Sequence, residues 1–248
     1  MDYLVSIIMP SYNSEFTIKE SIKSVIEQTY SNWELLITDD CSTDRTCQIV
    51  KEFVEQDDRI KLFVSDKNKG AGAARNNSIK ESSGRFLAFL DSDDLWAPDK
   101  LKEQINYMIM NGYALTYTAY SKIDAYGNIK KDIQPPSKVD FSSLLKSNVI
   151  GCLTAIYDTE VVGKVYMPLI RKRQDMALWL IILQKIDYAH CLNKNLAFYR
   201  EGHLSLSSNK IKIIKSQWEF YRYYLGFGYV KAMYYFLHYI QRALRKHA

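Results

Sequence analysis

The sequence predicts an α/β protein whose mostly parallel sheet is covered by helices on both faces. Two observations lead to this prediction. In the first hundred residues, short apolar runs alternate with stretches whose apolar residues repeat at helical spacing. This β-α-β-α-β-α-β order favours right-handed crossovers between parallel strands. From residue 113 the rhythm changes to strands joined by a short turn, which predicts a smaller antiparallel element.

Four strands and four helices are expected in the first half. The strands are expected at residues 5–9, 33–37, 60–64 and 85–90. The first helix spans 14–28, because Ile18, Ile22 and Val25 share one helical face. The second begins at a cap formed by Ser42 or Thr43 and runs to about residue 56. The third spans 70–82, and the fourth follows Pro98.

The second half is expected to be less regular. Antiparallel strands are predicted at 113–123 and 129–133, with Gly127 and Asn128 in the turn between them. A short strand at 153–157 and an apolar helix at 175–186 follow. Residues 211–244 read as helical, with interruptions at Gly226 and Gly228.

Composition narrows the class of protein. The chain has 248 residues, of which 47% are hydrophobic, so it can form a substantial core and is not expected to be disordered, collagenous or coiled coil. No apolar run approaches the roughly 18 residues of a membrane span, and the first residues lack the basic region of a signal peptide. Four cysteines without metal-binding spacing favour reduced thiols in a cytosolic protein.

Charge divides the chain in two. Residues 209–248 carry eight basic side chains against one acid, a net charge of +7, which leaves −2 on residues 1–208. We therefore expect a domain at 1–208, with halves at 1–112 and 113–208, followed by a basic helical tail at 209–248.

Polar residues follow all four expected parallel strands. In such sheets ligands bind at the carboxyl ends of the strands, so these residues are expected to converge on one site. They are Pro10, Ser11, Tyr12 and Asn13 after the first strand, Asp39 and Asp40 after the second, Asn68, Lys69 and Gly70 after the third, and Asp91, Ser92, Asp93 and Asp94 after the fourth.

The acidic group Asp91, Asp93 and Asp94 is the strongest chemical signal. Two carboxylates about 4 Å apart repel by roughly 4 kcal/mol at an effective dielectric near 20, so three of them need a cation. Hard oxygen ligands suit Mg²⁺ or Mn²⁺ and leave positions open for substrate phosphates. In the alternative interpretation, Asp94 caps the next helix and the other two carboxylates are solvated.

A small-residue stretch at 70–75 opens the third helix. It matches neither the dinucleotide-binding glycine fingerprint nor a P-loop. Arg75 could still reach a phosphate from the first turns of this helix. Alternatively, Gly70 only makes a turn and Arg75 lies on a solvated face.

Together these segments resemble family 2 glycosyltransferases of the GT-A fold. The resemblance is carried by VSIIMPSYN at 5–13, QTY at 28–30, WELLITDDCSTD at 33–44, NKG at 68–70 with ARN at 74–76, and FLDSDDLW at 89–96. Residues 173–179 and 199–207 resemble the bacterial branch that builds capsules, O-antigens and teichuronic-type polymers. The family implies transfer of a sugar from a nucleotide sugar, most often a UDP-sugar.

The resemblance also implies roles for single residues. Tyr12 would pack on a uracil ring, Asp40 would accept from its N3–H group with Asp39 in support, and Arg75 would lie near the base or diphosphate. The set implied for the nucleotide is Pro10, Ser11, Tyr12, Asn13, Asp39, Asp40, Asn68, Gly70, Arg75, Asp91 and Ser92.

A divalent ion, Mn²⁺ or Mg²⁺, is implied as the cofactor that neutralises the departing diphosphate. Asp91 and Asp93 would bracket the ribose and the metal, with Asp93 the more direct ligand. His203 is a secondary metal candidate, for which a structural role is the alternative. Residues implied near the donor sugar or acceptor are Asp94, Trp96, Thr154, Gln174 and Arg200.

An inverting transfer needs a general base for the acceptor hydroxyl, and Asp175 fits this role. Partial burial at the start of an apolar helix could raise its pKa toward neutrality. The family often has an acidic pair here, whereas this chain has Gln174-Asp175, so Asp175 carries the role alone. An ordinary helix N-cap is the alternative. The Gln-x-x-Arg-Trp motif of processive members is absent after Asp175, which predicts transfer of one sugar.

The tail predicts contact with a membrane surface. Val230, Met233, Leu237, Ile240 and Leu244 form an apolar stripe among basic and aromatic residues, as in helices that lie on anionic bilayers. The acceptor would then be a saccharide on a lipid such as a polyprenyl diphosphate, and the protein would be peripheral at the cytoplasmic face of the membrane. Alternatively, the stripe docks on the catalytic domain or on a second copy of the chain. Nucleic acid is not an expected partner, because the remainder of the chain is acidic.

Two other functions remain open from the sequence. A nucleotidyltransferase on a similar sheet would need a phosphate-activating lysine signature near the first loop, which residues 10–13 lack. A catalytically inactive nucleotide-binding scaffold is disfavoured by the intact acids Asp40, Asp91, Asp93 and Asp175.

Overall fold

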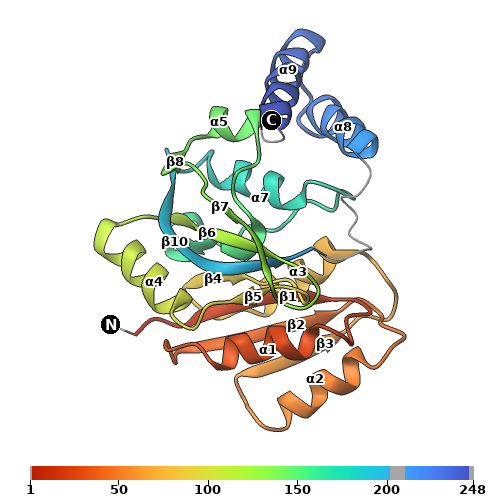
Figure 1. Ribbon diagram of the computed structural model, residues 1–248, viewed down its shortest axis with the longest axis vertical. Coiled ribbons are helices and arrows are strands. Elements are labelled where there is room, and N and C mark those ends of the chain that lie inside the picture. Colours follow the sequence, from red (N-terminus) through yellow and green to blue (C-terminus); the bar gives the residue numbers. More distant parts are fainter. Residues whose placement is uncertain (1, 202–209, 246–248) are drawn as a thin grey trace.

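A mixed sheet runs through the middle of the computed structural model, which describes residues 2–201 and 210–245 (Figure 1). In the described chain its path is β3 (Ile60–Val64), β2 (Trp33–Asp39), β1 (Val5–Ser11), β4 (Phe86–Phe89), β9 (Ile156–Asp158), β6 (Leu115–Ile123), β10 (Ala189–Arg200) and β5 (Leu95–Trp96). Off this path, β7 (Ile129–Ile133) pairs with β6, and β8 (Lys138–Val139) pairs with β10.

The directions of the strands confirm the predicted α/β class. Strands β1 to β4 are mutually parallel, and β10 is parallel to β6. β9 lies antiparallel between β4 and β6, and the β6–β7 pair forms the smaller antiparallel element expected from the sequence. The carboxyl ends of β1, β2 and β4 therefore lie at one edge of the sheet.

Alternating side chains of β1 pack into two cores, one on each face of the sheet. Ile7 and Met9 pack with α1 (Ile18–Ile26), α2 (Thr46–Val54) and α4 (Lys100–Asn111). Ile8 packs on the opposite face with α3 (Ala71–Glu81) and α7 (Gln174–Ile182). All seven residues of β1 are buried, which explains why this strand reads as an apolar run.

β1 continues through Pro10 to Ser11, beyond its expected end at residue 9. The carbonyl oxygens of Leu4 and Ile8 accept from Phe86 and Leu90, so even-numbered residues of β1 face β4. Pro10 also faces that side, but past the end of β4, where no ladder hydrogen bond is lost through its missing N–H. The strand thereby carries Pro10 and Ser11 to the edge where the polar loops meet.

Three local expectations were wrong. Helix α2 begins at Thr46, and Asp44 accepts from the Thr46 N–H, whereas Ser42 and Thr43 bind Asp39 and Asn13 instead of capping it. The strand expected at 153–157 begins only at Ile156, after a 3₁₀ turn at Cys152–Thr154. The twelve-residue strand β10 was not expected, because polar residues and register shifts interrupt its apolar pattern.

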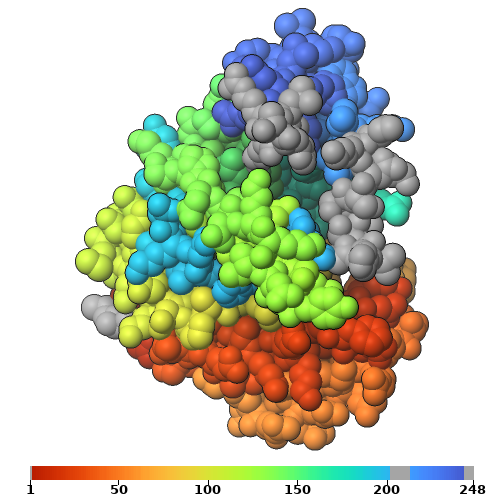
Figure 2. Space-filling view, viewed as in Figure 1, coloured from red at the N-terminus to blue at the C-terminus, as the bar shows by residue number. Residues whose placement is uncertain are grey.

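The remaining helices include α5 (Phe141–Lys146), α6 (Thr159–Val162) and the C-terminal group. That group comprises α8 (Lys210–Glu219), a π-helical turn (Phe220–Tyr224) and α9 (Tyr229–Arg245), with the expected break at Gly226, whose φ is +65°. Figures 1 and 2 show it at one end of the molecule, with α1 and α2 at the other. None of the described helices combines the length and apolarity needed to cross a bilayer.

The C-terminal group docks on the rest of the protein through a different face from the predicted stripe. Phe220, Tyr221 and Ala232 are buried, and α9 packs against α5. Of the predicted stripe, Val230 and Leu237 are 84% and 59% exposed, and the side chain of Leu244 lies outside the described residues.

Candidate functional site

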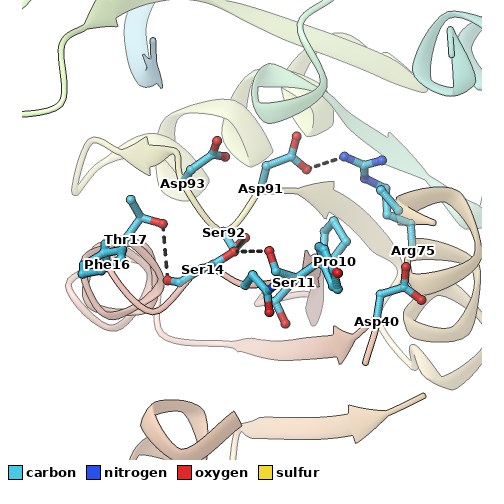
Figure 3. A pocket seen from close by; sticks show the side chains of 13 residues that line it. Pro10, Ser11, Ser14, Phe16, Thr17, Asp40, Arg75, Asp91, Ser92 and Asp93 are labelled. Atoms are coloured by element: carbon cyan, nitrogen blue, oxygen red, sulfur yellow. Dashed lines mark hydrogen bonds and ion pairs between the residues drawn. The ribbon is translucent and has the colours of Figure 1, made fainter. Parts of the chain in front are cut away.

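A cavity of about 500 Å³ opens where the carboxyl ends of β1, β2 and β4 converge (Figure 3). Its lining residues come from the end of β1, from the loops after these strands, including the turn that precedes α1, and from the start of α3. They are Pro10, Ser11, Tyr12, Asn13, Ser14, Phe16, Thr17, Asp40, Ala71, Arg75, Asp91, Ser92 and Asp93. Polar residues that follow three of the four parallel strands therefore meet here, whereas those expected after β3 do not line the cavity.

The loop after β1 is fastened to the loop after β2. Asn13 has a positive φ of 46°, and its N–H donates to Ser42 Oγ at 2.9 Å while its Oδ1 accepts from the Thr43 N–H at 2.9 Å. Asp39 is fully buried and accepts from Ser11 Oγ at 3.0 Å and from the Ser42 N–H at 2.7 Å. Asp39 thus orders the loops from behind and does not line the cavity.

Asp40 lines the cavity and also holds the loop that leads into α3. Its two carboxylate oxygens accept from the N–H groups of Lys69 at 2.8 Å and Gly70 at 2.6 Å. Gly70 needs its glycine because its φ is +88°. Each carboxylate oxygen has a second lone pair, so Asp40 can still accept from a ligand. Asn68 and Gly70 themselves are not among the lining residues.

Arg75 and Asp91 form an ion pair at the back of the cavity. Arg75 Nη2 lies 2.5 Å from Asp91 Oδ1, and the arginine is only 8% exposed. Burial alone would lower the pKa of Arg75, but the negative charge of Asp91 and its hydrogen bond, together with the charge of Asp175, raise it, so the guanidinium stays charged. Its buried Nε has no hydrogen-bond partner. Arg75 thus offers a fixed cation to an anionic ligand.

Asp93 points into the open part of the cavity (Figure 3). Asp93 as a whole is exposed, yet the surrounding loop partly removes its carboxylate from solvent. This desolvation, together with the charge of Asp91, raises the pKa of Asp93 to about 6. Ser92 holds this loop against the first one, since Ser92 Oγ lies 2.8 Å from Ser14 Oγ.

Asp94 is buried behind this loop. It accepts from the Arg200 N–H at 2.9 Å, and burial, followed by the charges of Asp93 and Asp91, raises its pKa well above the usual value. The Arg200 side chain donates to the Asp93 carbonyl at 3.0 Å and to Glu20 at 2.5 Å. Asp94 and Arg200 therefore fix the acidic loop from below and do not line the cavity.

Trp96 and Thr154 are also buried and do not line the cavity. Trp96 Nε1 donates to the Leu153 carbonyl at 2.8 Å, and Thr154 Oγ1 donates to the Gly151 carbonyl at 2.7 Å. Trp96 thereby joins the segment after the acidic loop to the 3₁₀ turn at Cys152–Thr154, and the Thr154 hydroxyl closes that turn on itself.

Asp91 and Asp93 are suited to bind a divalent ion whose remaining ligands come from a substrate. No group of three or more Asp, Glu, His or Cys side chains suited to a metal is assembled within residues 2–201 and 210–245. Mg²⁺ typically takes one or two protein carboxylates and completes its shell with phosphate oxygens and water. Two carboxylates beside an open cavity supply that donor set. His203, the secondary metal candidate, lies outside the described residues.

Asp175 lies in the first turn of α7, outside the cavity lining. Its Oδ2 accepts from Asn148 Nδ2 at 2.9 Å, and its charge is among those acting on Arg75. The N-cap interpretation was wrong, because α7 begins at Gln174 and its N-cap residue is Arg173.

Gln174 packs tightly on the start of α3. A Cβ placed on Gly72 would come within 2.7 Å of Gln174 Nε2, so glycine permits this close approach. Gln174 Nε2 itself donates to the Ile170 carbonyl at 2.5 Å. The contact sets the spacing between α3, which carries Arg75, and α7, which carries Asp175.

Sequence reasoning missed five residues of the site. Ser14, Phe16, Thr17 and Ala71 line the cavity, and Asn148 binds Asp175. The first four immediately follow recognised motifs, so extending each motif by one helical turn would have found them. Asn148 carries no such signal, because it meets Asp175 only through tertiary folding.

Comparison with known proteins identifies the protein family to which the chain is similar. Residues 6–164 match the family model described as Glycosyl transferase family 2. The chain is 41% identical over 244 residues to the putative teichuronic acid biosynthesis glycosyltransferase TuaG of Bacillus subtilis, covering 98% of this chain and 97% of the relative. It is 44% identical over 249 residues to the UDP-Glc:alpha-D-GlcNAc-diphosphoundecaprenol beta-1,3-glucosyltransferase WfgD of Escherichia coli, covering 100% and 96% of the two chains.

Solved structures share the fold. TarS residues 1–349 of S. aureus, in complex with UDP-GlcNAc, superpose with a TM-score of 0.71 at 22% identity over 86% of this chain and 65% of that one. Another crystal structure of S. aureus TarS gives a TM-score of 0.69 at 22% identity, and the match covers 88% of the present chain and 40% of that one. A mannosyltransferase from Pyrobaculum calidifontis, in complex with GDP-Man and Mn²⁺, gives 0.65 at 18% identity, over 86% and 60% of the two chains.

Proposed function

The chain belongs to glycosyl transferase family 2, is a glycosyltransferase with the GT-A fold, and on that premise we propose that it transfers one sugar from a UDP-sugar to a lipid-linked saccharide. The single observation that carries the proposal is the cavity that brings Asp40, Arg75, Asp91 and Asp93 together. One wall suits a nucleobase, and the other suits a diphosphate with its counter-ion.

Different residues of the cavity would bind different parts of the donor. Tyr12, whose ring is half exposed at the rim, would pack on the uracil, and Asp40 would accept from its N3–H. Arg75 would hold the diphosphate in place. Asp91 and Asp93 would hold a Mn²⁺ or Mg²⁺ ion, which supplies charge neutralisation for the departing diphosphate.

Asp175 is proposed as the general base of an inverting displacement. The acceptor oxygen forms a bond to the anomeric carbon while the bond from that carbon to the diphosphate breaks, and the acceptor proton passes to Asp175. Asn148 orients the carboxylate by occupying Oδ2, which leaves Oδ1 for the acceptor hydroxyl. UDP leaves with the electron pair of the broken bond.

The surroundings of Asp175 support an anionic, lipid-linked acceptor. Arg171, Lys172 and Arg173 lie two to four positions before the base, and within the described part of the chain none of them pairs with a carboxylate. One relative is named for an acceptor with a sugar on diphosphoundecaprenol. Basic residues two to four positions from the base suit the diphosphate of such an acceptor.

The C-terminal group supports contact with the membrane surface where such lipids reside, at its cytoplasmic face. The exposed large apolar side chains described in this group are Ile214, Tyr223, Tyr229, Val230, Tyr234 and Leu237, and Lys215 and Lys231 are exposed as well. An outward face of aromatic, aliphatic and basic residues suits an anionic bilayer.

The donor and the base can be tested together. Thermal unfolding with UDP-glucose, UDP-GlcNAc or GDP-mannose, with and without Mn²⁺, should show stabilisation of about 2.7 kcal/mol at a hundredfold excess over Kd for the true donor. Asp175→Asn should keep this stabilisation and lose transfer, and the product from the active protein should have inverted anomeric configuration by NMR. Retention of configuration, or full transfer by Asp175→Asn, would refute the mechanism, and full donor binding by Asp93→Ala would refute the metal role.

Membrane contact has a separate test. Full-length protein should float with anionic liposomes, and Val230→Gln with Leu237→Gln should abolish flotation. Met110→Gln, at an 84%-exposed apolar site on α4, is the matched control and should float like the unmodified protein. Equal flotation of both variants would remove the membrane proposal.

A further inference from the structure

Helix α7 starts from an unusual backbone conformation. Arg173, its N-cap residue, has φ 67° and ψ 23°, in the left-handed region, and no side chain caps the helix. A non-glycine residue in this conformation is strained and persists only where neighbouring structure holds it. Two residues later comes Asp175, so whatever holds Arg173 also sets the position of that carboxylate.

The C-terminal group holds Arg173. Arg173 Nη2 donates to Tyr239 Oη on α9 at 2.9 Å, and the guanidinium lies 5.4 Å from the centre of the same ring. Gln217, a fully buried residue of α8, places its Nε2 4.0 Å from Met176 Sδ, in the first turn of α7. Two helices of the group thus contact the residues on either side of Asp175.

The second support of Asp175 leads back to the same group. Asn148, which donates to Asp175 Oδ2, follows α5 by two residues. The carbonyl oxygen of Leu145, in the last turn of α5, accepts from the buried Tyr221 Oη at 2.5 Å. Both the backbone that precedes Asp175 and the amide that orients it are therefore fastened to C-terminal side chains.

We propose that the C-terminal helices position the catalytic base, with Tyr239 acting as a positioning residue through Arg173 and Tyr221 through the segment that carries Asn148. The inference rests on the proposed role of Asp175 as the base. It gives the C-terminal group two faces: the outward one is exposed, and the inward one sets the geometry of the acceptor side. The donor cavity, which has no lining residue from this group, is independent of it.

Tyr239→Phe tests the proposal because it removes the hydroxyl and keeps the ring. Tyr126→Phe is the matched control, since Tyr126 is 91% exposed in the turn between β6 and β7. Hydrogen exchange at the amides of residues 174–177 should accelerate about tenfold in Tyr239→Phe and remain unchanged in Tyr126→Phe. This readout needs no substrate.

Kinetics provide the second readout, with UDP-glucose and a short-chain α-GlcNAc diphosphate lipid as probes. For Tyr239→Phe, kcat should fall about tenfold, which is 1.36 kcal/mol of activation free energy, while the KM for the UDP-sugar stays within twofold. In an Arg173→Gly background, where glycine adopts the left-handed conformation freely, Tyr239→Phe should have no further effect on kcat. Additive losses would point to general destabilisation and overturn the proposal.

The outcomes separate this inference from the proposed function. If Asp175→Asn abolishes transfer but Tyr239→Phe changes neither amide exchange nor kcat, the positioning role is wrong and the base assignment stands. If Asp175→Asn keeps full transfer, the base assignment is wrong, and Tyr239 then positions no catalytic group even where exchange accelerates.

Discussion

Gly84→Ala should disrupt the register between β1 and β4, the two strands that carry Ser11 and Asp91 to opposite walls of the cavity. A Cβ at Gly84 would lie 2.6 Å from the Ser6 backbone nitrogen and 2.7 Å from the Leu4 carbonyl oxygen. Ordinary contact begins near 3.4 Å, so buried backbone would have to move by about 0.8 Å. Neither atom belongs to a flexible side chain that could turn away.

The expected cost has two parts. Overpacking of a buried site costs about 1–3 kcal/mol. Movement of Gly84 also breaks the hydrogen bond from its N–H to Ser6 Oγ, now 2.8 Å, and an unpaired buried donor costs a further 1–3 kcal/mol or so. We therefore expect the free energy of unfolding to fall by about 4 kcal/mol, with Tm about 10 °C lower.

Urea unfolding followed by circular dichroism measures this change directly. Gly228→Ala is the matched control: a Cβ there meets nothing within 4 Å, and its free energy of unfolding should stay within about 0.5 kcal/mol of the unmodified protein. If Gly84→Ala unfolds at the same urea concentration as Gly228→Ala, the close approach of β1 and the Gly84 turn does not constrain the sheet.

Two further substitutions probe the supports of the site, and a third probes the buried Lys100 at the start of α4. Asp40→Asn turns one acceptor toward the Gly70 N–H into a donor, which should cost about 1–3 kcal/mol in urea unfolding and remove the thermal shift with a UDP-sugar; an unchanged shift would contradict the role of Asp40. Arg200→Met removes the bonds to the Asp93 carbonyl and to Glu20 and should cost about 2 kcal/mol while weakening metal-dependent donor binding, whereas unaltered binding would show that the acidic loop holds itself. Burial lowers the pKa of Lys100 to about 7 from 10.5. Between these pH values Lys100 is protonated in the unfolded state and neutral in the folded state, so its contribution makes the free energy of unfolding rise with pH. Lys100→Met should flatten that rise by up to about 1.4 kcal/mol per pH unit between pH 7 and 8.5, and parallel stability curves for the two proteins would refute it.

The donor half of the site was accessible from sequence because its signals are local. Each strand end and the polar residues after it form one continuous segment, and parallel strands bring those ends together without further information. The cavity accordingly contains Asp40, Arg75, Asp91 and Asp93, as expected.

Other parts of the site depend on contacts between distant segments. Asp94 and Arg200 meet across 106 positions, and their hydrogen bond lies beneath the cavity. The sequence alone does not indicate whether a carboxylate of the acidic group faces a ligand or the interior of the protein. Strand β10, which carries Arg200, was missed for a related reason: its pairing with β6 compensates for a pattern too polar to predict a strand.

The docking face of α9 was also beyond the sequence pattern. Aliphatic residues mark the stripe through Val230 and Leu237, whereas the face that packs inward carries Ala232, Tyr235 and Phe236. Both faces are apolar, so the periodicity of the sequence predicts an amphipathic helix but does not indicate which face packs against the rest of the protein. Ala232 is fully buried on the inward face, where Tyr235 and Phe236 are partly buried, whereas Val230 and Leu237 of the stripe remain exposed.

The two halves of the site therefore respond differently to change in the chain. The groups proposed to bind the donor belong to short loops whose partners lie within the same sheet edge, so their geometry is expected to survive alteration of the C-terminal helices. Asp175 accepts a hydrogen bond from Asn148, which lies after α5. At the start of α7, Gln174 packs closely on Gly72 of α3, and Arg173 binds Tyr239 of α9. These contacts involve four separate segments. A substitution in any of these segments can shift the acceptor side while leaving the nucleotide pocket intact. Differences in acceptor choice among relatives with one donor are accordingly expected to arise from these supports as well as from the residues that touch the acceptor.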